Sequence, residues 1–234
     1  MAAFKKSVAR EYFESIVIAV ILALFIRTFV VQAFKIPTGS MERNLLIGDH
    51  LLVNKFVYGP ALTTAERVLL PDKSVRRGDV VVFKYPEDPE RDFIKRVIGL
   101  PGESVQVKAK KVFINDQPLE ETYVHFEQPP LGTPDRDEVT SSDVREAYGP
   151  VTVPPDHYFV MGDNRDNSQD SRYWGFLPRA YIKGKALLVY WSYEAERVDY
   201  VDGDGLSRRV EGILSVITHF FTRTRWDRLF HVIR

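Results

Sequence analysis

The stretch Phe34-Lys35-Ile36-Pro37-Thr38-Gly39-Ser40-Met41 follows directly on the only long apolar segment of the chain. It places a serine between a glycine and a methionine, where a membrane-crossing helix must give way to another structure. A serine hydroxyl is a weak nucleophile at neutral pH and needs a base within hydrogen-bond reach. We therefore interpret Ser40 as a candidate nucleophile at a membrane surface, and the rest of the chain must supply its base, oxyanion donors and substrate groove.

The apolar segment before this stretch is long enough to cross a membrane. It is uninterrupted from Ile16 to Ile26, and with its flanks it covers residues 13–34. As a helix this segment would measure about 33 Å at ~1.5 Å per residue. The basic N-terminus, residues 1–12, would stay in the cytoplasm by the positive-inside rule. The sequence thus predicts a single-pass transmembrane anchor, with everything after Phe34 exported.

A cleavable signal peptide is the alternative interpretation of this N-terminus. The basic start, the apolar run and Val31-Gln32-Ala33 resemble the three parts of such a peptide. The anchor is favoured because the apolar pattern continues past Arg27 to a spanning length. A charge at mid-bilayer is costly, but the position of Arg27 in the span would let it reach the outer interface.

Composition excludes several classes of protein. With 234 residues, of which 44% are hydrophobic, the chain can bury a core, which argues against global disorder. Its 32 basic and 32 acidic residues cancel, so no overall field points to nucleic acid. The absence of cysteine excludes a thiol nucleophile, thiolate metal sites and disulfides.

Beyond Ser40 the chain is typical of a β-rich domain. Short segments rich in Val, Ile and Phe are separated by Gly, Pro and Asp, as strands are. The predicted strands are 50–58, 80–85, 93–98, 104–107, 111–115, 149–153, 157–161 and 182–191. Residues 120–148 are polar and contain Pro129, Pro130 and Pro134, which indicates a small loop-rich insertion. The prediction is a mainly β exported domain over residues 35–205.

Residues 206–234 are predicted to form a basic amphipathic helical segment. Apolar residues recur at three- and four-residue steps from Ile213 to Phe221, and arginines follow. Such a segment could lie on a membrane surface or pack on the sheet, and the sequence leaves both open. The aspartates between 199 and 204 lack the glutamate of a calcium loop, so we expect a solvated turn there.

Lys95 is the best candidate for the base of Ser40. It lies in Asp92-Phe93-Ile94-Lys95-Arg96-Val97-Ile98, where burial would disfavour the charged amine and lower its pKa. A neutral amine could then take the serine proton. The segment by itself is more typical of an exposed lysine on an edge strand, because most lysines are exposed. None of the five histidines lies in a local frame typical of a catalytic triad.

A third, polar block runs from Met161 to Gly175 as Met-Gly-Asp-Asn-Arg-Asp-Asn-Ser-Gln-Asp-Ser-Arg-Tyr-Trp-Gly. One interpretation is a long surface loop. The other is a polar network that orients a catalytic group, in which charges such as Asp170 and Arg172 compensate one another. The spacing of the carboxylates does not match a calcium loop, so no metal is predicted.

Together these blocks resemble bacterial type I signal peptidases (leader peptidases), the membrane-bound Ser–Lys serine proteases that remove signal peptides from exported proteins. The matching blocks are 36–41, 77–102 and 162–172, in the family order. The resemblance implies a signal-peptidase-like β-rich fold, cleavage after an Ala-x-Ala type site, and no cofactor. It also implies a place in the bacterial inner (plasma) membrane, with preproteins and the lipid bilayer as partners and no nucleic acid.

The resemblance further implies roles for individual residues. Ser40 would be the nucleophile and Lys95 the general base, acting through an acyl-enzyme. Thr38 would form the oxyanion hole together with the Ser40 amide, at a position where many members have serine. The residues expected to line the substrate pockets are Phe34, Ile36, Met41, Leu45, Phe93 and Ile94.

In the third block, Ser168 matches the family serine that orients the lysine, and Asp170 and Arg172 match a supporting ion pair. The sequence departs from the family pattern in two ways. Its insertion is short and lacks the cysteines that some relatives carry, and it has one clear spanning segment where some relatives have two. Neither departure touches the catalytic set.

Three other functions share parts of this pattern. A self-cleaving Ser–Lys repressor-type protease would use the same dyad, but a DNA-binding head is missing. A membrane-anchored binding module would tolerate the loss of both Ser40 and Lys95. A Ser-His-Asp hydrolase would require a histidine and would not require Lys95.

Overall fold

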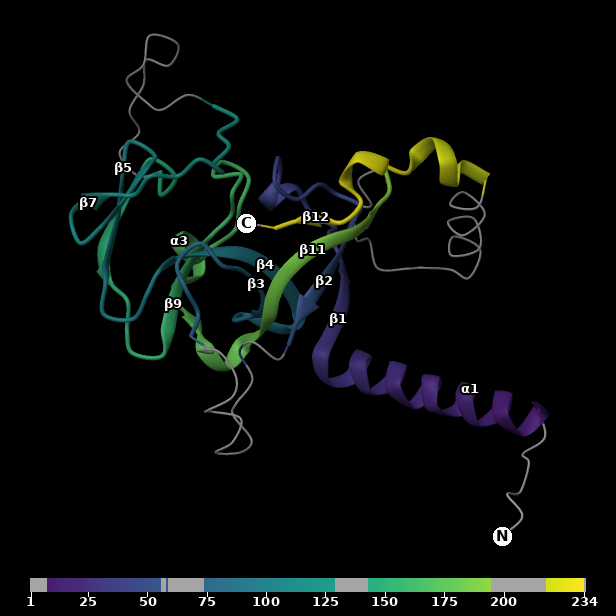
Figure 1. The fold of residues 1–234 in the computed structure, drawn as a ribbon. Helices are drawn as coiled ribbons and strands as arrows, with labels where there is room; N and C mark the ends of the chain where they lie inside the picture. The colour runs from purple at the N-terminus through teal and green to yellow at the C-terminus, as the bar shows by residue number, and fades with distance from the viewer. Residues whose placement is uncertain (1–7, 56–57, 59–73, 129–142, 195–217, 234) are drawn as a thin grey trace.

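The part of the chain that the structure describes is β-rich and contains two antiparallel sheets (Figure 1). The computed structural model describes residues 8–55, 58, 74–128, 143–194 and 218–233. Every strand segment predicted from the sequence overlaps an observed strand. The strands that the prediction missed are β1, which lies in the expected membrane span, and three two-residue strands, β7, β10 and β12.

The larger sheet has eight strands in the order β1-β2-β11-β3-β4-β9-β10, with β12 paired to β11. Its strands are β1 Val31–Lys35, β2 Asp49–Asn54, β3 Val80–Tyr85, β4 Asp88–Gly99, β9 His157–Met161, β10 Leu177–Pro178, β11 Ile182–Ser192 and β12 His231–Val232. β11, which comes from the C-terminal part of the chain, thus lies between β2 and β3, which come from the N-terminal half. Short helical turns among the described residues connect these strands: η2 Gly39–Met41, α3 Ser171–Trp174, η3 Arg179–Tyr181 and η4 Trp226–Arg228.

The smaller sheet has the order β7-β6-β5-β8 and lies beside the end of β4. Its strands are β5 Ser104–Lys108, β6 Lys111–Ile114, β7 Gln117–Pro118 and β8 Ala147–Thr152. A turn joins β6 and β7, with Asn115 and Asp116 at positive φ, a conformation that these residues tolerate well. Of the predicted insertion at 120–148, residues 129–142 lie outside the described residues, and β8 already begins at Ala147.

A single helix precedes the sheets. It comprises α1 (Val8–Phe25) and a π-helical turn, η1 (Ile26–Val30), and it projects away from the sheets (Figure 1). No side chain of α1 is buried, although most of the helix is apolar. Over the residues that the structure describes, no helix has both the length and the apolar character that a membrane crossing requires.

The helix leads directly into the larger sheet. The prediction carried the span to Phe34, whereas Val31–Lys35 form β1 and pair with β2 from Asn54 to His50. The N–H of Lys55 donates to the carbonyl of Val30 (3.0 Å), and its Nζ donates to the carbonyl of Thr28 (2.9 Å). The apolar composition of β1 continues the hydropathy pattern of the helix, so only the tertiary pairing with β2 ends it there.

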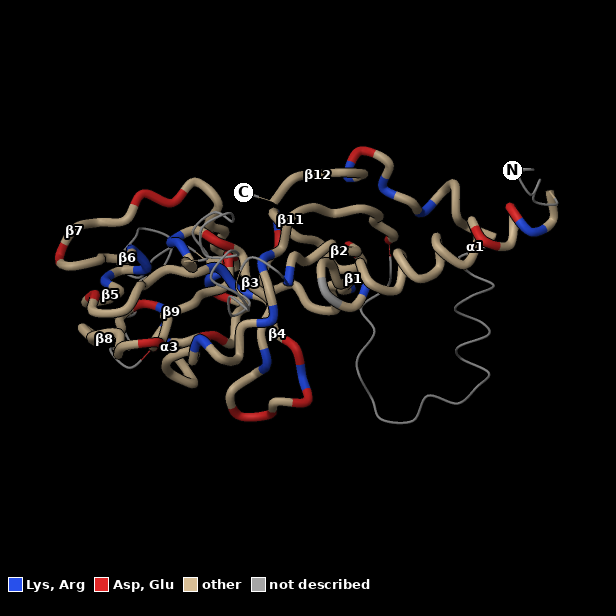
Figure 2. The backbone as a smooth tube through the Cα atoms, turned by 60° about the horizontal axis from the view of Figure 1, so that its bottom comes forward, with Lys and Arg blue, Asp and Glu red and all other residues tan. Residues whose placement is uncertain are grey.

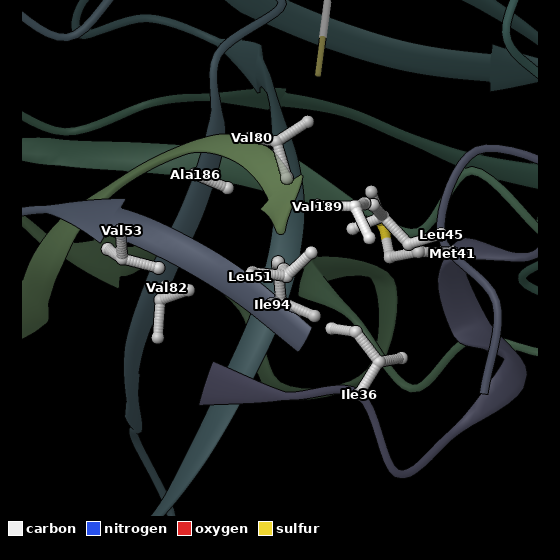
Figure 3. Close-up of a cluster of buried hydrophobic side chains, with 10 residues drawn as sticks. All are labelled: Ile36, Met41, Leu45, Leu51, Val53, Val80, Val82, Ile94, Ala186 and Val189. Atoms are coloured by element: carbon white, nitrogen blue, oxygen red, sulfur yellow. The ribbon is translucent and has the colours of Figure 1, made fainter. Parts of the chain in front are cut away.

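Three clusters of buried side chains hold the sheets together. The first joins the segment after β1 to one face of the larger sheet, and Figure 3 shows Met41 and Leu45 beside Val189 at one end of it. The second packs on β3, β4 and β9, and the third lies between β4, β9 and the smaller sheet. The segment that contains Ser40 is therefore part of the core and not a free loop.

The C-terminal segment returns to the larger sheet. Of the predicted helical segment 206–234, residues 206–217 lie outside the described residues, and 218–223 are helical. The chain then forms η4 and β12, which pairs with Leu188 and Val189 of β11. The final described residues are thus a short strand and not a continuation of the helix, because their N–H and C=O groups pair with the sheet.

Candidate active site

Ser40 lies in the short turn η2, which follows β1. Its side chain is buried, with 6% of the residue exposed. The Glu42 N–H donates to the Gly39 carbonyl (3.0 Å) and the Leu45 N–H to the Met41 carbonyl (2.8 Å). From the third block, the Asn164 N–H donates to the carbonyl of Ser40 itself (3.1 Å). The backbone of the serine is therefore fixed from both its own turn and a distant loop.

Lys95 meets Ser40 directly. Its Nζ lies 2.6 Å from Ser40 Oγ, although 55 residues separate the two in sequence. Lys95 is on β4, opposite Val81 of β3, and is 3% exposed. The ring of Phe93, two residues earlier on the same strand, lies 5.4 Å from the amine. The lysine is thus buried beside the serine, and the alternative of an exposed edge-strand lysine is wrong.

Burial changes the protonation of this amine. Loss of hydration lowers the pKa of Lys95 to about 8, and the neighbouring Arg172 acts in the same direction. The carboxylates of Asp170 and Asp163 act in the opposite direction. With a pKa near 8, about a tenth of the molecules carry a neutral amine at pH 7. A neutral Lys95 at this distance can accept the hydroxyl proton of Ser40.

Asp170 and Arg172 form a buried ion pair next to the lysine. Arg172 donates from Nε and Nη2 to the two carboxylate oxygens (2.8 Å each), and both side chains are at most 1% exposed. Burial would raise the pKa of Asp170, but the charge and hydrogen bonds of Arg172 outweigh it and hold that pKa below its ordinary value. Asp170 also accepts from the Gly162 N–H (3.1 Å). The third block is therefore a buried polar network and not a surface loop.

The hydroxyl of Ser168 is buried beside this ion pair. It forms no hydrogen bond of ordinary geometry with a described residue, so the expected bond to Lys95 is not formed. It does lie near enough to Asp170 to help lower the pKa of that carboxyl. The Ser168 hydroxyl is thus buried near Asp170 without a well-formed hydrogen bond of its own to a described residue.

Thr38 precedes η2 in extended conformation. The residue is exposed, and its side chain makes no capping bond to the turn. Its hydroxyl is therefore not needed to hold the turn and can contact another group.

A second buried ion pair was not predicted from the sequence. Arg96, next to Lys95, donates from Nε and Nη2 to Asp163 (2.8 and 2.6 Å), and both side chains are 1% exposed. Asn44 donates to the same carboxylate (2.7 Å) from the segment after Ser40. Two features of the sequence could have suggested this ion pair: Arg96 is adjacent to Lys95, and Asp163 belongs to the third block. Through side chains, the pair links the second and third sequence blocks to each other and to the segment after Ser40.

The six residues predicted to line substrate pockets fall into two groups. Ile36, Met41, Leu45 and Ile94 are buried in the first cluster (Figure 3). Phe34 packs against this cluster. Phe93 packs instead on the second cluster, because neighbours on a strand face opposite sides of a sheet. Of the six, Phe34 and Phe93 are the ones left partly exposed. The other four are buried in the first cluster, behind Phe34.

One edge of β4 is open beside the dyad. β9 pairs with β4 from Arg96 to Gly99 and not before, whereas β3 pairs with β4 down to Asp88. In the described residues, the segment of β4 that ends at Lys95 therefore has a strand on one side alone. Such an edge can accept an extended peptide as an added strand.

Other chemistry finds little support in the described residues. Their histidines make no hydrogen bond to Ser40; His50, for example, packs on the ring of Trp191. No three His, Asp or Glu side chains among these residues come together in a way that could hold a metal ion. The geometry thus favours acyl transfer by a serine and a lysine over a Ser-His-Asp arrangement.

Comparison with known proteins gives a consistent result. The family model described as "Signal peptidase, peptidase S26" matches residues 9–191. The signal peptidase I of Pseudomonas aeruginosa is 38% identical over 213 residues, covering 81% of this chain and 75% of the relative. The probable signal peptidase I-2 of Synechocystis is 40% identical over 207 residues, covering 86% of this chain and 81% of the relative.

A solved structure is also similar. The crystal structure of a signal peptidase I from Enterococcus faecalis is 32% identical and covers 48% of this chain and 96% of that chain. The TM-score of the superposition is 0.37.

Proposed function

The chain belongs to the signal peptidase family, peptidase S26, and on that premise we propose how its own residues perform the reaction of a type I signal peptidase. The enzyme is a serine endopeptidase that removes N-terminal signal peptides from exported preproteins. The observation that carries the proposal is the 2.6 Å distance between Lys95 Nζ and Ser40 Oγ in a buried site. Ser40 is the nucleophile and Lys95 the general base.

In the first half of the reaction, neutral Lys95 takes the proton of Ser40 while Oγ bonds to the carbonyl carbon of the scissile peptide. The protonated amine then gives this proton to the leaving nitrogen, the C–N bond breaks, and the mature protein departs with a free amino terminus. Ser40 holds the signal peptide as an ester. The buried position of Lys95 supports this role because it keeps about a tenth of the amine neutral at pH 7.

In the second half, water replaces the leaving group. Lys95 takes a proton from the water, which attacks the ester carbonyl, and returns it to Ser40 Oγ as the signal peptide leaves as a carboxylic acid. Ser168 is proposed to orient the amine during these transfers. Its buried hydroxyl, without a well-formed hydrogen bond to a described residue, supports that proposal, since a buried hydroxyl generally requires a partner.

The oxyanion of each tetrahedral intermediate is proposed to accept hydrogen bonds from the Ser40 N–H and the Thr38 hydroxyl. Thr38 is exposed at the start of the turn that holds Ser40, so its hydroxyl is free to face a bound carbonyl. One donor of this type contributes roughly 2.7–4 kcal/mol to catalysis. The ion pair of Asp170 and Arg172 supports the site by fixing the loop that contains Ser168.

The substrate is proposed to bind as an extended strand on the open edge of β4. Side chains of the strand would then point alternately toward the face that carries Phe34 and toward the face that carries Phe93. With Ile36, Met41, Leu45 and Ile94 packed behind Phe34, the bound strand would meet a shallow apolar surface, which would accept alanine and reject large residues by clash. This supports cleavage after an Ala-x-Ala type site.

We propose that the helix of residues 8–30 is a single-pass anchor in the bacterial inner (plasma) membrane. Its charged residues lie mostly near the N-terminal end (Figure 2), and its apolar side chains are exposed in the isolated chain. A lipid environment would cover them. The N-terminus would then be cytoplasmic and the catalytic domain extracytoplasmic. Protease protection of tagged termini in sealed vesicles tests this topology, and a digested N-terminal tag in intact spheroplasts would contradict it.

The experiment that tests the reaction compares the wild type with Ser40→Ala and Lys95→Ala in detergent or liposomes. The substrate is a preprotein whose signal ends in Ala-x-Ala. We expect the wild type to cut after the last alanine and both variants to fall to background. Lys108→Ala, which removes an exposed lysine of β5 outside the site, is the control and should keep its activity.

The alternative functions predict different results. Near-normal activity of Lys95→Ala would move the base to another group and reopen the Ser-His-Asp hydrolase. An inactive wild type would favour a binding module. Self-cleavage of the chain without cleavage of the preprotein would favour a repressor-type protease.

A further inference from the structure

Two arginines of the C-terminal segment bind the segment that follows Ser40. Arg228 donates from Nε and Nη2 to the carboxylate of Asp49 (3.1 and 2.6 Å) and from Nη2 to the carbonyl of Asn44 (2.8 Å). Arg225 donates from Nη1 to the carbonyl of Ile47 (3.0 Å). These contacts join residues that are 178 to 184 positions apart, and both arginines lie outside the region 9–191 that matches the family model.

The segment that these arginines bind is a closed loop. At its base, the Ile36 N–H donates to the Asp49 carbonyl (2.8 Å) and the Gly48 N–H to the Ile36 carbonyl (3.0 Å). Ser40 lies between these closing residues. Asp49 also accepts from the N–H of Leu46 (2.8 Å), so its carboxylate organises the second half of the loop. Because Ser40 is in the same loop, a displacement of the second half would shift the backbone of the serine as well.

Asp49 depends on Arg228 for its charge balance. The Asp49 side chain is fully buried, and that of Arg228 is 12% exposed. A buried carboxylate without a cation is strongly unfavourable, and removing one partner of such a pair is more damaging than replacing both. Loss of Arg228 would therefore leave the Asp49 carboxylate buried without a cation, which would drive it toward solvent and disturb the loop.

The contact with Asn44 extends the same arrangement toward the dyad. The Arg228 guanidinium holds the carbonyl of Asn44, while the Asn44 side chain donates to Asp163 (2.7 Å) and to the Tyr123 carbonyl (2.9 Å). Asp163 in turn binds Arg96, the neighbour of Lys95. Asn44 is thus held by the C-terminal segment through its carbonyl, and by the network of Asp163 and Arg96 through its side chain.

We propose that Arg228 is a positioning residue for Ser40: through Asp49 and Asn44 it sets the loop that presents the serine to Lys95. The inference rests on the proposed function, because it assigns Ser40 as the nucleophile. Arg228 touches neither substrate nor the reacting atoms. It acts on the rate of acylation by fixing the position of Oγ, where small displacements have large effects on rate.

The test measures kcat, KM and thermal unfolding of the full chain with the Ala-x-Ala preprotein. The variants are Arg228→Ala, Arg228→Lys and Asp49→Asn, and Arg223→Ala is the matched control. Arg223 belongs to the same segment and makes no side-chain hydrogen bond to a described residue. We expect Arg228→Ala and Asp49→Asn to lower kcat at least tenfold with KM changed less than threefold. Arg228→Lys should be intermediate, because a lysine replaces a two-pronged contact with a single one.

A positioning role also predicts non-additivity. The double variant Arg228→Ala, Asp49→Asn should lose little more kcat than the worse single variant, since both changes break the same pair. If Arg228→Ala does not fold, Asp49→Asn and Arg228→Lys decide the question. Unchanged kcat per folded molecule in these variants, even with a lower melting temperature, would overturn the inference. An inactive wild type would refute the proposed function instead.

Discussion

Gly162 lies so close to Ser40 that a Cβ atom at Gly162 would be 2.5 Å from the Ser40 carbonyl oxygen. The same Cβ would be 2.5 Å from Cβ of Ser168. The absence of a side chain at this position is therefore what lets the end of β9 pass between the nucleophile and the serine expected to orient the base. The requirement is one of space, because Gly162 does not have a positive φ.

The first prediction follows from this crowding. Gly162→Ala should lower kcat/KM at least a hundredfold, because the methyl group must displace the backbone of Ser40 or the side chain of Ser168. Preprotein cleavage by the folded variant measures this effect. Gly99→Ala is the control, since its Cβ would meet Val105 and Phe159 in the third cluster, away from Ser40. Both variants should lose stability, and equal losses of kcat/KM would contradict the explanation.

The second prediction concerns the pH dependence of cleavage. The base must be neutral, so activity rises as pH increases through the pKa of Lys95, which burial lowers to about 8. A plot of log kcat/KM against pH should therefore rise with unit slope below about pH 8 and level off above it. A midpoint near the ordinary lysine pKa of 10.5 would mean that the amine is hydrated as in a free lysine.

A charge variant can assign this midpoint to Lys95. The carboxylate of Asp170 raises the pKa of Lys95, second only to burial in size and opposite in direction. Asp170→Asn should therefore move the midpoint to lower pH while lowering overall stability. Asp92→Asn, at an exposed ion pair with Lys183, provides the control and should leave the midpoint in place. A midpoint that stays at the same pH in Asp170→Asn would belong to a group other than Lys95.

The third prediction links the same amine to stability. The unfolded chain holds the lysine proton up to about pH 10.4, whereas the folded site releases it near 8. Between these two pH values the unfolded state binds more protons than the folded state. Lys95 therefore destabilises the fold below about pH 8, and this destabilisation decreases as pH rises from about 8 to about 10.4. Lys95→Met should thus be more stable than the wild type by roughly 3 kcal/mol near pH 7.

Denaturant unfolding at about pH 6, 7, 9 and 10, on either side of the folded-state pKa, checks this prediction. The difference between Lys95→Met and the wild type should be largest at the two lower pH values and should shrink toward the highest. Using the difference between the two proteins removes the titration of all groups that they share. A difference that stays constant with pH would show that the substituted side chain stabilises by packing alone.

Local patterns predicted most of the β structure, and the places where they failed have tertiary causes. The segments 80–85 and 157–161 match β3 and β9 because each is apolar and bounded by turn residues. Val31–Lys35 continue an apolar helix pattern, and nothing in their own sequence indicates that they pair with β2. β12 is formed by the partner strand β11, since two residues carry no periodicity of their own.

The same distinction applies to the site. The flanks of Lys95 suggested burial, but an exposed lysine fitted them better, and only the contact with Ser40 decides between the two. The resemblance to a family placed Asp170 and Arg172 together, as the structure does. The contacts of Arg228 with Asp49, and of Asn44 with Asp163, join residues more than a hundred positions apart. No spacing rule connects such residues, because their proximity is a product of the completed sheet.

The last prediction concerns the hydroxyl of Thr38. Thr38→Val keeps the shape of the side chain and removes only the donor, so it should lower kcat by roughly 10²–10³ with little change in KM. Thr38→Ser restores a hydroxyl and should retain most of the wild-type kcat, although the lost methyl group frees its rotamer. Because Thr38 is exposed and does not cap η2, neither change should lower the melting temperature by more than a few degrees. If Thr38→Val keeps kcat within about threefold, the Ser40 N–H must stabilise the oxyanion without this hydroxyl.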